Sequence, residues 1–341
     1  DLDRLAAALT RLELEGVRGP SVYGLVYEAD AWWVSGNSND SYVNQRVAGN
    51  ASFQFDLRNR LALGLEYRDW HDRRGGYDVL ESGRQNFFDE DPDKWHEPKV
   101  NGVYSFGAPA TKGKVEIFGD YGWRRYENND QENRHRNTGN IGGTFFFRVQ
   151  PKTQALIEAR YRRINYVNED PGTVSLDSKE SILYVGAVWD ATAKTSGSVR
   201  VGGQRKDFDA SERENYSGAS WEANINWKPR TYSMFDLTTS QMPYEPVFAS
   251  DDYILVTSVA LDWTHDWNSR LHSKVGVLYQ FNDFNRTDQT DHRWGFEAGI
   301  RYQMRRWLDL AAGYRYDDRD SDIESGGYKS NVFMLSAEAA M

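Results

Sequence analysis

A two-residue alternation of apolar and polar side chains recurs about sixteen times between Val22 and Met341, in segments of roughly ten residues. It is clearest over residues 219–228 and 294–303. Because successive side chains of a strand point to opposite faces, each segment has one apolar and one polar face. A soluble sandwich needs a second sheet to cover its apolar face, whereas a barrel can place that face against lipid and its polar face around a lumen. We therefore expect an all-β fold, a closed antiparallel transmembrane β-barrel of about 16 strands.

The composition excludes a helical membrane protein and is compatible with a barrel. Mean hydropathy is −0.76, 27% of the residues are charged, and no stretch approaches about 20 consecutive apolar residues. Aromatic residues make up 14% of the chain, including 12 Trp and 20 Tyr, which suits girdles of rings at the two membrane interfaces. The alternative is an aromatic-rich soluble β-protein. The absence of cysteine excludes disulfides and thiol chemistry.

The predicted location is the outer membrane of a Gram-negative bacterium, where barrels of this kind occur. Such a protein requires a signal peptide, and the sequence shows none. We expect that the signal peptide has been removed by processing.

Short and long connections alternate along the chain. Short ones lie near residues 58–60, 108–113, 150–153, 191–196, 228–231, 265–269 and 304–307, and long polar ones at 35–41, 71–99, 127–137, 167–179, 207–215, 242–252, 284–291 and 317–327. This pattern predicts short periplasmic turns and longer extracellular loops. All nine prolines fall outside the predicted strands. The long segments are acidic on balance and the short ones basic, which reflects either simple solvation or an outer rim for divalent cations and an inner rim for anionic cargo.

The polar side chains that the alternation directs inward form the predicted transport pathway. Buried charges need a partner or water, so a lining of mixed acids and bases implies a hydrated lumen crossed by ion pairs. The alternative is a lumen packed shut by those pairs. Charged and amide groups also suit sugar hydroxyls, which need both donors and acceptors. The predicted lumen residues are Arg46, Glu66, Arg68, Lys114, Glu116, Arg148, Glu158, Arg160, Glu222, Lys274, Glu297 and Arg301.

Two segments are candidates for a gate or a plug. The predicted loop over residues 71–99 is the longest and carries apolar groups that a merely solvated loop does not need. Its candidate gate residues are Tyr77, Phe87, Phe88 and Trp95. At the other end, leucines at helical spacing over residues 1–20 predict an amphipathic, periplasmic N-terminal helix, separate from the barrel over residues 21–341.

No catalytic or metal-binding constellation is evident. The six histidines are scattered, without HExxH or another metal-ligand spacing. The acidic run Asp317–Glu324 lacks the spacing of a calcium loop and is better explained as a solvated loop. We expect no enzymatic activity, no cofactor and no metal ion.

Four segments also resemble a known family. They are WDATAKTSGSVRVGGQRKDF (189–208), SWEANINWKPRTYSMFDLTTS (220–240), LDWTHDW (261–267) and YRYDDRDSDIESGGYKSNVFMLS (314–336). They look like the outer-membrane beta-barrel porins encoded with exopolysaccharide operons, the EpsL-like group, from about Asn140 to the C-terminus. The final Met341 departs from the terminal aromatic of many outer-membrane strands.

The resemblance implies export of an exopolysaccharide across the outer membrane. The partners expected from it are the polysaccharide cargo and a periplasmic export protein, besides membrane lipids and lipopolysaccharide around the barrel. No nucleic-acid partner is expected. A general diffusion or small-solute porin is the alternative function.

Overall fold

A computed structural model describes residues 5–34, 41–72, 91–108, 111–168, 172–192, 194–246, 251–287, 289–322 and 326–339. These residues form one 17-stranded antiparallel sheet. The strands are β1 (Leu5–Arg18), β2 (Ser21–Val34), β3 (Tyr42–Gln54), β4 (Asn59–Asp72), β5 (Asp93–Phe106), β6 (Gly113–Tyr126), β7 (Arg136–Gln150), β8 (Thr153–Tyr166), β9 (Ser178–Thr192), β10 (Thr195–Phe208), β11 (Tyr216–Arg230), β12 (Ser233–Tyr244), β13 (Ile254–Asp266), β14 (Leu271–Phe284), β15 (Thr290–Arg305), β16 (Leu308–Ser321) and β17 (Tyr328–Ala339). The all-β antiparallel part of the prediction is confirmed.

Each strand pairs with the next one in the chain, so the sheet is a continuous meander of hairpins. Short connections such as Gly19–Pro20 alternate with longer ones, and a 3-10 turn, η2 (Glu132–Arg134), lies in the connection between β6 and β7. No helix in the described ranges is long and apolar enough to cross a membrane.

The predicted N-terminal helix is wrong. Residues 5–18 form β1, which pairs with β2 without interruption from Leu5↔Val34 to Arg18↔Ser21. The leucines are spaced as in a helix, but the same segment also alternates as a strand does over Leu12, Glu13, Leu14 and Glu15. The two patterns overlap, so the sequence alone does not separate helix from strand here. Pairing with β2 satisfies one backbone edge of this segment, and that tertiary contact overrides the weak local signal.

The predicted closed barrel of about 16 strands is also wrong. The sheet has one strand more, and in the described part of the chain no pairing joins β17 to β1. With an odd number of antiparallel strands, β1 and β17 have the same chain direction in the meander, so they lack the antiparallel relation that closes an even-stranded barrel. Alternation fixes which side chains share a face, but it does not encode the strand tilt and register that closure needs.

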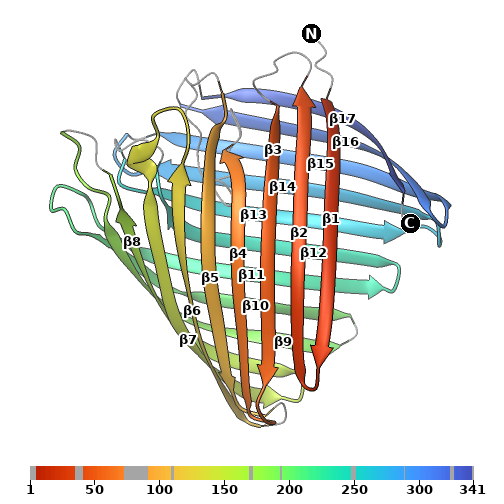
Figure 1. Cartoon of the computed structure of the whole chain (residues 1–341), viewed down its shortest axis with the longest axis horizontal. Coiled ribbons are helices and arrows are strands. Elements are labelled where there is room, and N and C mark those ends of the chain that lie inside the picture. Colours follow the sequence, from red (N-terminus) through yellow and green to blue (C-terminus); the bar gives the residue numbers. More distant parts are fainter. Residues whose placement is uncertain are drawn as a thin grey trace.

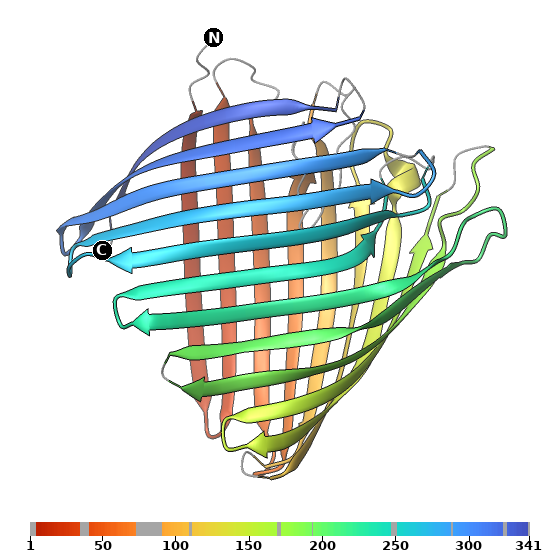
Figure 2. The same ribbon diagram turned by 180° about the vertical axis from the view of Figure 1, so that it is seen from behind.

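The sheet twists and curls, so that its first and last strands lie on opposite sides of the molecule and run in different directions (Figures 1 and 2). In Figures 1 and 2 the strand direction turns steadily from β1, in red, to β17, in dark blue. This progressive rotation is the ordinary right-handed twist of strands accumulated over the whole sheet. Among the described residues β1 pairs only with β2 and β17 only with β16, so these two strands are the edges of the sheet.

Three prolines correct the predicted strand limits. Pro98, Pro229 and Pro243 lie inside β5, β11 and β12 rather than in connections. At Pro98 the pairing with β6 is interrupted between His96↔Arg125 and Lys99↔Gly122. Because proline has no N–H to donate, it is tolerated where the ladder is already open.

The two faces of the sheet differ in chemistry and in exposure. Leu65, Ile157, Leu183 and Ile300 belong to the apolar face and are each about half exposed or more. On β9 the alternation is sharp, since Leu183 is 59% exposed and its neighbour Tyr184 is fully buried. Such a continuous exposed apolar face is the kind of surface that lipid covers.

Candidate functional site

Side chains of the polar face bridge strands that are not neighbours in the sheet, which indicates that this face is concave. Arg160 of β8 bonds to Glu222 of β11, although β9 and β10 lie between them. On a flat sheet these strands would be about 14 Å apart, so the sheet must bend toward the polar face here. We call this bend, formed by β8 to β11, the crease.

A row of alternating charges crosses the polar face of the first four strands. Arg46 of β3 lies 2.8 Å from Glu28 of β2 and 2.7 Å from Glu66 of β4. Arg11 of β1 extends the row to Glu28 at 2.7 Å, and Arg68 lies 2.6 Å from Glu66. The row forms because these positions share one side of the pleat and lie close in register.

A second group of charges lies on the last strands. Lys274 of β14 lies 2.6 Å from Glu297 of β15 and 3.3 Å from Asp262 of β13. Arg301 of β15 contacts Asp309 at 3.5 Å and also pairs with Glu338 of β17. Lys274 and Arg301 are about half exposed, so the polar face is more open to water here than at the crease.

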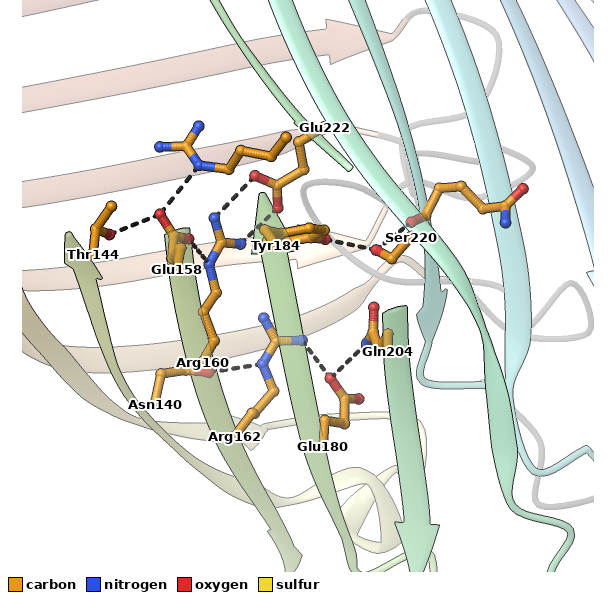
Figure 3. A network of polar contacts seen from close by, with 12 residues as sticks. Asn140, Thr144, Glu158, Arg160, Arg162, Glu180, Tyr184, Gln204, Ser220 and Glu222 are labelled. Carbon is orange, nitrogen blue, oxygen red and sulfur yellow. Dashed lines mark hydrogen bonds and ion pairs between the residues drawn. The ribbon is translucent and has the colours of Figure 1, made fainter. Parts of the chain in front are cut away.

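The crease holds a buried network (Figure 3). Glu158 is 2% exposed and accepts hydrogen bonds from Thr144 at 2.8 Å, from Arg200 at 3.1 Å and from Arg160. Arg160 makes a two-pronged contact with Glu222, at 2.6 and 3.0 Å. Planar guanidinium and carboxylate groups match in this geometry, which links β8 to β11 across the bend.

A second part of the network centres on Glu180 of β9. Its carboxylate accepts from Lys206 at 3.1 Å, from Gln204 at 3.2 Å and from Arg162 at 3.3 Å. Beside it, the hydroxyls of Tyr184 and Ser220 lie 2.6 Å apart. The labelled side chains in Figure 3 thus converge on one face from five strands, β7 to β11.

Glu245, just after β12, ties the end of that strand across the crease. It accepts a hydrogen bond from the Tyr166 hydroxyl at 2.7 Å and pairs with Lys206. Burial opposes its charge, but Lys206 and the Tyr166 hydroxyl outweigh burial and hold the pKa of this carboxyl below its usual range. Through these contacts residues 243–245 lie next to the ends of β8 and β10.

A polar pocket of about 310 Å³ lies where residues 243–245 approach the concave face of β4 to β8. We call it the loop-end pocket. Its basic residues are Arg68, Lys99, Arg124, Arg136 and Arg162, and its acidic residues are Glu97, Asp120 and Glu245. Gly122 lies in its lining between Lys99 and Thr138, its register partners on β5 and β7.

The predicted lumen residues share the polar face. Those at the charge rows and the crease are brought into ion pairs, and Lys114 lies 2.8 Å from Glu116 near the short connections. Arg148 lies opposite Gln154, also on the polar side. The grouping follows from alternation alone, whereas a role in transport stays a prediction for all twelve residues.

The predicted gate loop begins later and ends earlier than expected. His71 and Asp72 end β4 and residues 93–99 begin β5, so Trp95 is a strand residue. Trp95 is fully buried, donates to Asp72 at 2.8 Å and stacks on Arg124 at 3.8 Å. Trp95 is therefore a strand residue and not a loop residue, and its role as a gate stays a prediction. Tyr77, Phe87 and Phe88 lie outside the described residues.

Because the predicted connections 71–99 and 127–137 are too long, the sequence analysis does not identify part of the loop-end pocket. Glu97, Lys99 and Arg136 were assigned to connections, but they belong to β5 and β7. Continuing the two-residue alternation backward from Asn101 and from Asn140 places all three on the polar face, so the signal was present. Glu245 has no such signal, because its position depends on the bend of the sheet.

Together these features define a class of protein. A long antiparallel meander with an exposed apolar face and a polar concave face is the architecture of transmembrane β-proteins. A family model described as "Putative beta-barrel porin 2" matches residues 110–341, more than half of the chain. The chain belongs to this family of beta-barrel porins. A comparison with curated proteins found no match.

Similar folds are found among solved structures of iron transporters. The FrpB iron transporter from Neisseria meningitidis (F3-3 variant) is 10% identical with a TM-score of 0.54, over 99% of this chain and 65% of that one. The ferric citrate transporter FecA, unliganded, is 14% identical with a TM-score of 0.56, over 98% and 60%. The ferric-catecholate import receptor Fiu from E. coli K12 is 10% identical with a TM-score of 0.52, over 99% and 68%.

At such identities the likeness shows the fold alone. The chain also spans less than two thirds of the FrpB and FecA chains that it matches.

Proposed function

We propose that this protein is an outer-membrane porin that exports an exopolysaccharide along its polar concave face. The observation that carries the proposal is the spread of that chemistry, since charged groups recur on this face from β1 to β17. A moving polymer needs many weak contacts, because one tight site would stall it. Paired acids and bases offer both donors and acceptors to sugar hydroxyls along the whole path.

Membership of a beta-barrel porin family supports transport as the role, and the resemblance to porins of exopolysaccharide operons supports the cargo. The exposed apolar face supports contact with lipids and lipopolysaccharide of a Gram-negative outer membrane. A periplasmic export protein would meet the short-connection end. No step of the proposal requires catalysis or a cofactor.

Deletion of the gene tests the proposal. We expect surface polysaccharide to be lost, uptake of small solutes to stay nearly unchanged, and the wild-type gene to restore secretion. If the deletion strain keeps its polysaccharide but takes up a small nutrient more slowly, the export proposal is wrong and the protein is a small-solute porin.

A further inference from the structure

The loop-end pocket contains one cationic and one hydroxyl side chain that make no hydrogen bond or ion pair among the described residues, Arg136 and Thr138. Its volume, about 310 Å³, lies at the lower end of ligand-site volumes and suits one or two sugar rings. It lies on the concave face, where the proposed cargo would pass.

Every acidic group of the pocket is already engaged. Glu97 accepts from Arg124 at 2.6 Å, and Asp120 accepts from Asn140 at 2.7 Å and lies 3.3 Å from Lys99. Glu245 is held by Lys206 and by the Tyr166 hydroxyl, as described above. Each carboxylate of the pocket is therefore in direct contact with a side chain other than Arg136.

Arg136 is a cation of the pocket that none of these carboxylates contacts directly. It lies on the polar face at the start of β7, and among the described residues its guanidinium makes no ion pair within 4 Å and no side-chain hydrogen bond. The charges of Glu245 and Glu97 act on it only from a longer distance. The Thr138 hydroxyl, two residues further on the same face, has no hydrogen-bond partner there either. A guanidinium offers five donors in a planar fork that matches a carboxylate.

The floor beside these groups is open because residue 122 is glycine. A Cβ built on Gly122 would meet Glu97 at 3.6 Å and the Lys99 side chain at 3.7 Å, which are ordinary contacts. A small side chain could therefore be accommodated, whereas a larger one would extend into the pocket. Glycine thus leaves space beside the Arg136 guanidinium and the Thr138 hydroxyl.

We propose that the loop-end pocket binds the carboxylate of an acidic sugar unit, with Arg136 as its partner and Thr138 donating to or accepting from a sugar hydroxyl. The inference rests on the proposed function in taking this sugar as part of the exported polymer. The cargo is then an acidic polysaccharide rather than a neutral one. Binding at this single pocket rests on one ion pair and one hydroxyl contact, each of modest net strength, which keeps it weak enough for release.

Calorimetry on the purified full chain in detergent tests binding directly. The probes are tri-galacturonate, the neutral maltotriose at equal concentration, and inorganic phosphate. We expect tri-galacturonate to bind more tightly than maltotriose, with an affinity that falls as salt rises. If phosphate competes as well as the uronate does, or the neutral sugar binds equally, the assignment to acidic sugars is wrong.

Three variants locate the site. Arg136→Gln should weaken tri-galacturonate binding at least about tenfold, because a charge-assisted contact is lost. Gly122→Leu should abolish binding by filling the floor, while Gly122→Ala keeps most of it. Arg315→Gln removes the same charge from a distant part of the polar face and should change the affinity less than about twofold. An equal loss in Arg136→Gln and Arg315→Gln would show a diffuse charge effect and overturn the site.

The two proposals fail in different ways. If deletion abolishes surface polysaccharide but the purified protein binds no uronate, only the acidic-sugar site is wrong. If the protein binds uronate through Arg136 but deletion leaves the polysaccharide intact, the site stands and its assignment to an exported cargo fails.

Discussion

At the scale of single residues, charges on the polar face differ in how much they contribute to stability. Glu158 is 2% exposed and holds two arginines and a threonine, whereas the exposed Lys274 is 51% accessible and has water as an alternative partner. Removing one member of a buried ion pair leaves the other uncompensated, but an exposed ion is simply rehydrated. The crease should therefore be the part of the face that resists substitution.

Replacing Glu158 with alanine should lower the free energy of unfolding by about 3 to 5 kcal/mol, because Arg200 and part of Arg160 lose their counter-ion. The matched control Lys274→Ala should cost less than about 1 kcal/mol. Urea unfolding in lipid vesicles, followed by tryptophan fluorescence, measures both. Similar losses in the two variants would contradict a buried network at the crease.

Glu245 gives the protein a pH dependence with a defined sign. Its folded-state pKa is depressed, so its contribution is fully present above the ordinary carboxyl pKa of 4.5 and is lost as pH falls through the lower folded value. We expect the stability of the wild type to fall more steeply below pH 4.5 than that of Glu245→Gln, which has no charge to lose. Parallel curves of unfolding midpoint against pH would show that Lys206 and Tyr166 do not stabilise the ionised form.

At the scale of strands, the two faces of β11 provide a direct comparison. Ala223 lies mid-strand on the apolar face, between Val199 of β10 and Thr239 of β12. Its neighbour Asn224 lies on the polar face, between Ser198 and Thr238. The same substitution at these adjacent positions therefore samples lipid in one case and water in the other.

Ala223→Arg should cost about 2 to 4 kcal/mol in a bilayer, the penalty for arginine on a lipid-facing strand near the midplane. Asn224→Arg should cost much less, since its side chain can reach water and nearby carboxylates. Reversible folding into phospholipid vesicles measures the difference. Equal tolerance at both positions would mean that the apolar face does not meet lipid.

Sequence alternation predicts the faces of strands better than their ends. Phe296 and Ile300 belong to the predicted alternating segment 294–303 and are exposed on its apolar face, and Arg46 and Glu66, both predicted to face the lumen, form an ion pair. Trp95 and Arg136 lie in strands but fall in predicted connections, because polar residues near both, and a proline near Trp95, are typical of a loop. Backbone pairing nevertheless continues through both positions. The contact of Arg160 with Glu222 has no signal in either strand, because it depends on how sharply the sheet bends.

At the scale of the whole molecule, the sheet is most tightly bound at its crease and least at its edges. Strands β8 to β10 are paired on both sides and joined by the ion pairs of the buried Glu158 and Glu180, whereas β1 and β17 are each paired on one side among the described residues. An edge strand leaves every second backbone N–H without a partner in the sheet. Lipid cannot supply one, so the edges are the place where such a sheet needs water or another strand.

Hydrogen exchange of the purified protein should therefore show a two-residue period along β1 and β17. Amides directed at β2 or β16 are protected, and those directed away exchange quickly, whereas β9 is protected at every position because β8 and β10 flank it. The alternating residues within β1 act as their own control for fraying, since both sets lie on the same strand. Uniform protection along β1, equal to that of β9, would show that a strand covers this edge and would contradict the open sheet.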